Sequence, residues 1–154
     1  MMTNLSCEVL KALADKTLVT AESCTGGGIG AALTAIPGSS AVYKGGVICY
    51  TNWVKENILG VEHTLLENHG AVSEPVAVAM AEGARRQLKA DVAVSVTGLA
   101  GPGGDEYGNS VGTVFIGYAD ANVVFAKEFH FSGNREAVRS QAVQTALQTI
   151  LENN

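Results

Sequence analysis

The sequence TLVTAESCTGGGIG at Thr17–Gly30 changes within a few residues from a strand pattern to a glycine-rich turn and then to a helical pattern. Apolar and β-branched residues before Glu22 are typical of a strand, whereas Ile29 and Leu33 recur at helical spacing beyond the glycines. Ser23 stands where the two patterns meet. Because the first N–H groups of a helix have no partners within the helix, we expect this junction to stabilise an anion or a developing oxyanion.

The composition limits the size of the fold and the kind of partner. The chain has 154 residues, of which 47% are hydrophobic and 16% charged, and its net charge is −5. This length suits one core, so we expect residues 1–154 to form a single domain. The low charge content indicates apolar surface shared with another subunit, and we expect a homo-oligomer, with a dimer favoured. Nucleic acid is not expected as a partner, since phosphate backbones are bound by clustered Lys and Arg.

The sequence also bears on location and on metal binding. No apolar run approaches the about 20 residues needed to cross a bilayer, and the N-terminal residues lack the features of a signal peptide. We therefore expect a cytoplasmic protein with no membrane partner. Cys7, Cys24 and Cys49 are widely spaced, and the three histidines do not have the spacing of metal ligands. We expect reduced thiols, no metal and no cofactor.

Helical and strand patterns alternate along most of the chain. The periodicity predicts helices at 5–15, between Ser23 and Pro37, around Lys55, from Ser73 to Leu88 and at 135–151. Strands are predicted at 17–22, 41–50 with an irregularity at Gly45-Gly46, 91–97, 113–119 and 123–131. This order predicts an α/β protein: a three-layer α/β/α sandwich with a mixed, mostly parallel sheet of about five or six strands.

Two glycine-rich loops follow predicted strands, one after Glu22 and one at 98–112, which contains six glycines. Ligands of such sheets bind at the carboxyl ends of the strands, so we expect both loops to face one ligand. The alternative is that Ser23 or Thr25 only caps a helix and that the glycines only turn the chain. Cys24 competes with Ser23 as a nucleophile, although a free cysteine beside a core is more commonly buried and inert.

Charge is distributed unevenly around the first loop. The interval between Glu22 and Glu56 contains Lys44 and Lys55 and no acidic residue, which suits a small molecule that carries a phosphate. Lys55 could deprotonate a serine if burial lowered its pKa, or it could be an ordinary solvated lysine. The glycines at 26–31 also match the GxGxxA dinucleotide pattern. That pattern requires an acidic residue about 20 positions later, which the acid-free interval excludes.

Four motifs occur in order: AESCTGG at 21–27, GGVICYTNWVK at 45–55, GAVS at 70–73 and TGLAGPGG at 97–104. Together they resemble the CinA C-terminal-domain family. This family includes amidases that convert nicotinamide mononucleotide to nicotinic acid mononucleotide and ammonia. The resemblance covers residues 5–151 and implies one CinA C-terminal-like amidohydrolase domain that acts without a metal on a small nucleotide substrate.

The resemblance also implies roles for individual residues. Ser23 matches the nucleophile and Lys55 the general base of a Ser/Lys mechanism. Tyr50 matches a tyrosine near this pair, and Thr97 matches a threonine expected to help hold the oxyanion. Arg135 matches a substrate-side arginine. Further substrate-binding positions are expected at Thr25, Gly26, Gly27, Gly46, Gly98 and Gly101.

The chain departs from the family pattern in the second loop. Where relatives commonly read Lys-Pro-Val-Gly, this chain has 109–112 Asn-Ser-Val-Gly, and Asp105 and Glu106 add negative charge. Losing a lysine that touches a substrate phosphate would weaken binding by about 1.5–3 kcal/mol. Two alternatives therefore stay open. One is a nucleotide-binding paralogue with an altered 105–110 loop and no turnover, and the other is a purely structural subunit. Arg139, one turn after Arg135, is the other candidate for the substrate-side arginine.

Overall fold

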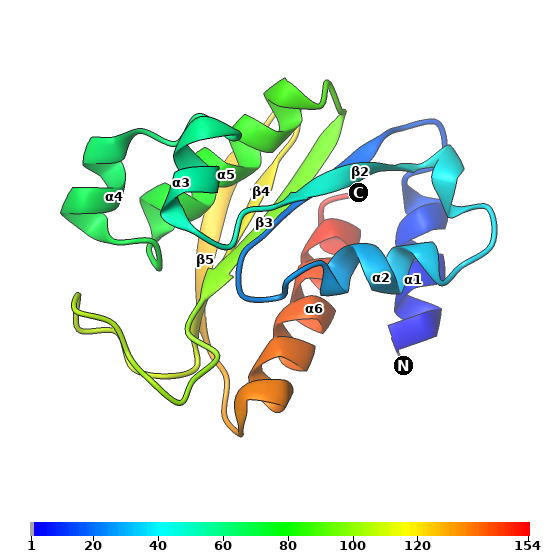
Figure 1. The fold of residues 1–154 in the computed structure, drawn as a ribbon. Helices are drawn as coiled ribbons and strands as arrows, with labels where there is room; N and C mark the ends of the chain where they lie inside the picture. The colour runs from blue at the N-terminus through cyan, green and yellow to red at the C-terminus, as the bar shows by residue number, and fades with distance from the viewer. Residues whose placement is uncertain (1) are drawn as a thin grey trace.

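The computed structural model describes residues 2–154, which form one five-stranded sheet with helices on both faces (Figure 1). The strand order is β2-β1-β3-β4-β5, in which β1 runs parallel to β2 and β3, whereas β3–β4 and β4–β5 are antiparallel pairs. The predicted α/β fold with a mixed sheet is thus confirmed. The strands are β1 Leu18–Glu22, β2 Tyr43–Ile48, β3 Val92–Gly98, β4 Thr113–Ala119 and β5 Val124–His130.

The helices form the two outer layers. One face of the sheet is covered by α1, α2 and α6, and α5 covers the other face together with the short helices α3 and α4 (Figure 1). A single 3-10 turn, η1 Ser39–Ala41, precedes β2. The α-helices are α1 Met2–Ala12, α2 Gly28–Thr34, α3 Asn52–Asn57, α4 His63–His69, α5 Glu74–Gln87 and α6 Arg135–Glu152.

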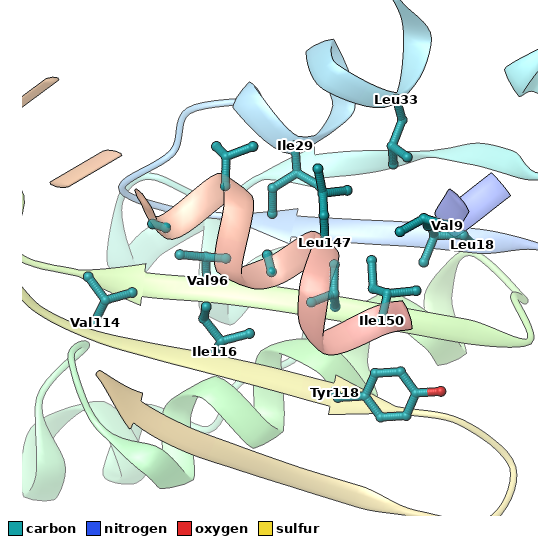
Figure 2. Packing of buried hydrophobic residues seen from close by; sticks show 14 of the residues in the cluster. Val9, Leu18, Ile29, Leu33, Val96, Val114, Ile116, Tyr118, Leu147 and Ile150 are labelled. Atoms are coloured by element: carbon teal, nitrogen blue, oxygen red, sulfur yellow. The ribbon is translucent and has the colours of Figure 1, made fainter. Parts of the chain in front are cut away.

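Strand β3 is buried between these layers, because its side chains alternate between two apolar cores. Val94 and Val96 pack with α6 in one core, and Ala93 packs with α5 in the other. Figure 2 shows Val96 in the same core as Leu147 of α6 and Ile29 of α2. A sheet covered on both faces leaves the ends of its strands as the place where a ligand can enter.

Several predicted elements are found with shifted ends. The first helix begins at Met2 and ends at Ala12, before Asp15, whose backbone φ of 72° is left-handed and does not continue a helix. Ser73 does precede α5 as predicted, but its hydroxyl donates to the Gly70 carbonyl and does not cap the helix. Helix α4 was not predicted.

The predicted irregularity in β2 is present. The register with β1 shifts between Leu18 and Val19, which pair with Tyr43 and Gly45. A β-carbon at Gly46 would overlap the side chain and carbonyl of Thr20, so this position has no room for a larger residue. The glycine pair therefore lets β2 pack closely on β1.

The connection from β1 to α2 differs from the predicted one. Helix α2 begins only at Gly28, after a turn at 23–27, and Glu22 at the end of β1 is 2% exposed. The Glu22 carboxylate accepts four hydrogen bonds of 2.8–3.1 Å, from the hydroxyls of Thr20 and Thr25 and from the N–H groups of Ile29 and Gly30. The helix N–H groups that we expected to hold a ligand are bound by the chain's own carboxylate, so this expectation is wrong.

Replacing this carboxylate is expected to destabilise the fold. Glu22→Ala leaves one buried and one partly buried N–H group without acceptors and should lower the free energy of unfolding by about 2–4 kcal/mol. Urea unfolding at pH 7 measures the change. Glu8→Ala, which removes an exposed carboxylate from α1, is the matched control and should change stability little. Equal unfolding midpoints for the two variants would contradict a structural role for Glu22.

Candidate active site

A cavity of about 690 Å³ opens at the carboxyl ends of β1 and β3. Ser23 lines it from β1, Thr97 from β3 and Lys55 from α3. The loop after β3 forms the opposite wall, with residues up to Tyr107, and Arg135 of α6 completes the rim. The structure thus brings together segments that are more than 100 positions apart in the sequence. This is where ligands of α/β sheets are expected to bind.

Ser23 and Lys55 meet at the floor of this cavity. Lys55 Nζ donates to Ser23 Oγ at 3.1 Å and to the Cys49 carbonyl at 2.8 Å. Lys55 is 1% exposed and Ser23 is 7% exposed. Within residues 2–154, no carboxylate lies within 4 Å of Lys55 Nζ. The lysine is therefore a buried amino group without a counter-ion, in contact with a hydroxyl.

This environment favours the neutral amine. Burial lowers the pKa of Lys55 from its ordinary value of 10.5, because a charged ammonium loses its hydration. The neighbouring thiols of Cys24 and Cys49 oppose this shift only when they are ionised. Burial raises the pKa of both thiols to about 11, so they are uncharged at neutral pH. A neutral Lys55 can accept the Ser23 proton, and Cys24 is a poor nucleophile here.

Arg135 lies at the mouth of the cavity. It is the first residue of α6. Asn134 caps the N-terminus of this helix, because its side chain accepts a hydrogen bond from Ala137 N at 2.9 Å. Its guanidinium donates to the Gly101 carbonyl at 2.6 Å and to the Tyr50 hydroxyl at 3.3 Å. It therefore links the loop after β3 to the segment that carries Tyr50, and three of its five N–H donors are left for a ligand.

Two other predicted polar residues make structural contacts. Thr97 lines the cavity, but its hydroxyl donates to the Ala71 carbonyl at 2.8 Å. A hydroxyl has one proton, so in this arrangement it is not a donor for an oxyanion. Arg139 donates to the carbonyls of Cys24 and Thr25 at 3.0 and 3.1 Å and supports the turn after Ser23. Of the two candidate arginines, only Arg135 lines the cavity.

The other expected substrate-binding positions divide into two groups. Gly98 and Gly101 line the cavity. Thr25, Gly26, Gly27 and Gly46 are not among the lining residues. Thr25 points to Glu22, and Gly46 faces Thr20 within the sheet. Gly26 and Gly27 have backbone φ values of 58° and 101°, so they form the turn.

The loop after β3 is fixed by contacts that the sequence analysis missed. Asp105 accepts from Asn109 Nδ2 at 2.8 Å and from the N–H groups of Asn109 and Tyr107. Asn109 also donates to the Val72 carbonyl at 3.1 Å, and the Tyr107 hydroxyl donates to the Glu67 carbonyl at 3.0 Å. Partial burial raises the pKa of Asp105, but these hydrogen bonds outweigh it and lower the pKa below its ordinary value. Asp105 and, four positions later, Asn109 in a glycine-rich loop are the sequence signal for a loop held by side-chain bonds to its own backbone.

In residues 2–154, no three side chains of His, Cys, Asp or Glu are arranged to hold a metal ion. None of the helices in the same range combines the length and the hydrophobicity that crossing a bilayer requires.

The site and the fold together define an α/β protein with a buried Ser–Lys pair in an open cavity. The family model described as CinA C-terminal domain matches residues 2–153. The chain belongs to this family. It is similar to the nicotinamide-nucleotide amidohydrolase PncC of Escherichia coli, with 47% identity over 135 residues that cover 87% of this chain and 82% of that protein.

Other relatives are longer proteins. A CinA-like protein of Parasynechococcus marenigrum is 52% identical over 134 residues, which cover 86% of this chain and 32% of that protein. The chain thus spans about a third of the length of the first such relatives. Among solved structures, a CinA superfamily protein from Escherichia coli has a TM-score of 0.96 at 37% identity, covering 100% of this chain and 91% of that chain. CihA from Agrobacterium tumefaciens has a TM-score of 0.95 at 39% identity, covering 99% and 96%.

Removing the buried amine is expected to stabilise the protein. Because the pKa of Lys55 is lowered in the folded state, the unfolded state binds more protons between that pKa and 10.5, and stability rises with pH in this window. Lys55→Met should increase the free energy of unfolding at pH 7 by about 0.5–2 kcal/mol, and the gain should shrink toward pH 10.5. Urea unfolding between pH 7 and 10 tests this. Lys44→Met, at an exposed lysine, is the control, and a pH-independent gain would contradict the explanation.

Proposed function

We propose that this chain hydrolyses the carboxamide of nicotinamide mononucleotide to nicotinic acid mononucleotide and ammonia by a Ser/Lys mechanism. The observation that carries the proposal is the 3.1 Å contact between the buried Lys55 Nζ and Ser23 Oγ at the floor of the cavity. The similarity to the amidohydrolase PncC supports an amidohydrolase. The Ser/Lys chemistry is inferred from the contact and from the lowered pKa of the lysine.

The reaction proceeds in two halves. Neutral Lys55 takes the Ser23 hydroxyl proton while Ser23 Oγ attacks the carboxamide carbon, and the resulting ammonium gives its proton to the leaving nitrogen. Ammonia departs and an acyl-serine is left. Lys55 then deprotonates a water molecule, which attacks the acyl carbon, and the proton returns to Ser23 Oγ as the carboxylic acid is released. No proton is gained or lost by the enzyme over the cycle.

Backbone groups stabilise the oxyanion in this mechanism. The N–H of Cys24 directly follows the nucleophile, lies at the cavity and donates to no oxygen atom of residues 2–154. Such a donor next to the nucleophile is a common part of an oxyanion hole. Thr97 holds the Ala71 carbonyl, so its role is to fix the wall of the cavity. Arg135 and Tyr50, at the mouth, contact the part of the substrate away from the carboxamide.

Ser23→Ala and Lys55→Arg test the mechanism. Ser23→Ala removes the nucleophile, and Lys55→Arg supplies a side chain that cannot be deprotonated, so each should reduce kcat for ammonia release by about 10²–10⁴-fold or more. Ser132→Ala and Lys44→Arg, both exposed, are the matched controls. An active Ser23→Ala variant would exclude the assigned nucleophile. Binding of the nucleotide by wild type without ammonia release would support the paralogue that lacks turnover.

The pH dependence tests the base separately. Only the neutral amine can accept the serine proton, so kcat/KM should rise with pH and level off at the pKa of Lys55. Because burial lowers this pKa, the plateau should begin below pH 10.5. Initial rates between pH 6 and 10 give the profile. A flat profile over this range would show that deprotonation of Lys55 does not limit the reaction.

A further inference from the structure

Gly83 lies in the interior of helix α5, where a glycine is unfavourable. It is buried, and its backbone is helical, so no left-handed conformation requires a glycine at this position. Glycine in a helix interior is less stable than alanine, because it loses more backbone freedom on folding. The presence of a glycine here therefore needs an explanation in packing.

The packing of the turn that follows helix α3 supplies this explanation (Figure 1). A β-carbon at position 83 would overlap the carbonyl oxygen of Leu59 and would lie 3.3 Å from the Leu59 β-carbon. Leu59 is fully buried and belongs to the same core as Val76 and Met80 of α5. The overlap is with the main chain, which cannot rotate away as the end of a flexible side chain can. Gly83 thus lets the main chain after α3 lie directly on α5.

This turn is bonded to the backbone of Lys55, because the Val61 N–H donates to the Lys55 carbonyl at 3.0 Å. In residues 52–61, the buried residues are Lys55, Leu59 and Val61. Helix α3 is therefore held on the protein by Lys55 itself and by the turn that rests on α5. The distance of this turn from α5 determines how far Lys55 reaches toward Ser23.

Helix α5 has no room to move toward the sheet. Ser95 of β3 donates to the Ala77 carbonyl of α5 at 2.6 Å. A β-carbon at Gly117 of β4 would overlap the same carbonyl, so α5 already lies in direct contact with the strands. A side chain at position 83 would therefore displace the turn and α3, and not α5.

We propose that Gly83 is a positioning residue for Lys55: the absence of a side chain at this position lets α3 lie close enough to α5 for Lys55 Nζ to contact Ser23 Oγ. The proposal rests on the proposed Ser/Lys function. Gly83 does not line the cavity, so it acts only through the turn and through Lys55. A displacement of about 1 Å in a reacting group can reduce a rate about a hundredfold.

Gly83→Ala tests the proposal by adding one methyl group at this contact. The pKa of Lys55 is measured by NMR titration of lysine side chains labelled with carbon-13 at Cε, with Lys55→Met to assign the signal. Moving α3 outward should hydrate the ammonium and raise the pKa of Lys55 toward 10.5, since the neighbouring thiols of Cys24 and Cys49 are unchanged. At pH 7, kcat for ammonia release from nicotinamide mononucleotide should fall about tenfold to a hundredfold. The plateau of kcat/KM should begin at a higher pH.

Ala81→Gly is the matched control, because it weakens the same buried helix without adding an atom against the turn. Positions two apart in a helix face different directions, so Ala81 does not share the contact of Gly83 with Leu59. Urea unfolding measures how much stability each variant loses. The control should keep the wild-type kcat and the wild-type pKa of Lys55. An unchanged pKa in Gly83→Ala, or equal changes in both variants, would overturn the positioning role.

The NMR titration needs no turnover, so it separates this proposal from the proposed function. If the wild type releases no ammonia, the proposed function fails, and the pKa of Lys55 in Gly83→Ala still decides the role of the glycine. If Gly83→Ala unfolds in buffer, all the proteins are compared in trimethylamine N-oxide, which favours the folded state. A variant that stays unfolded there would show that Gly83 serves the fold alone, and would overturn the proposal.

Discussion

The buried carboxylate of Glu22 determines how the chain leaves strand β1, and the active site depends on this junction. By accepting from both hydroxyls and both helix N–H groups around it, Glu22 joins the end of β1 to the start of α2. The turn between them then places Ser23 at the edge of the sheet, where its own N–H donates to the Val96 carbonyl at 2.9 Å. Ser23, the proposed nucleophile, is thus held through its N–H by β3 and through its hydroxyl by Lys55, which fixes its position in the cavity.

The same junction explains why the N-terminus of α2, where we expected a ligand, is not available to bind one. A helix N-terminus after a strand is a general anion site, and the glycines after Ser23 fit that pattern. In this protein the N-terminus of α2 binds the carboxylate of Glu22, the residue before Ser23. Negative charge that develops during the reaction must therefore be met by N–H groups of the turn itself, next to Ser23, and not by helix α2.

Much of the fold could be predicted from the sequence, because long periodic segments such as β3, α5 and α6 bury one face or both against the rest of the chain. Helix α4, of seven residues, has too few turns to show a periodicity. The contact of Lys55 with Ser23 could be expected only from the family pattern, since nothing local shows that a lysine on a short helix points inward. Thr25 and Gly46 were expected to bind the substrate but do not line the cavity. Their place within a motif does not specify the direction in which they face.

The loop after β3 shows how the residues that fix a loop also determine the charge that the loop presents. Asn109 donates to Asp105 and to the Val72 carbonyl, at a position where the resemblance to the family leads us to expect a lysine. Asn109 donates both of these bonds through its uncharged Nδ2, whereas a lysine at this position would place a positive charge beside Asp105. Stabilising the loop by this means places the Asp105 carboxylate in the cavity wall, with an uncharged residue at position 109. The electrostatic character of the cavity is thus a consequence of how this loop is folded.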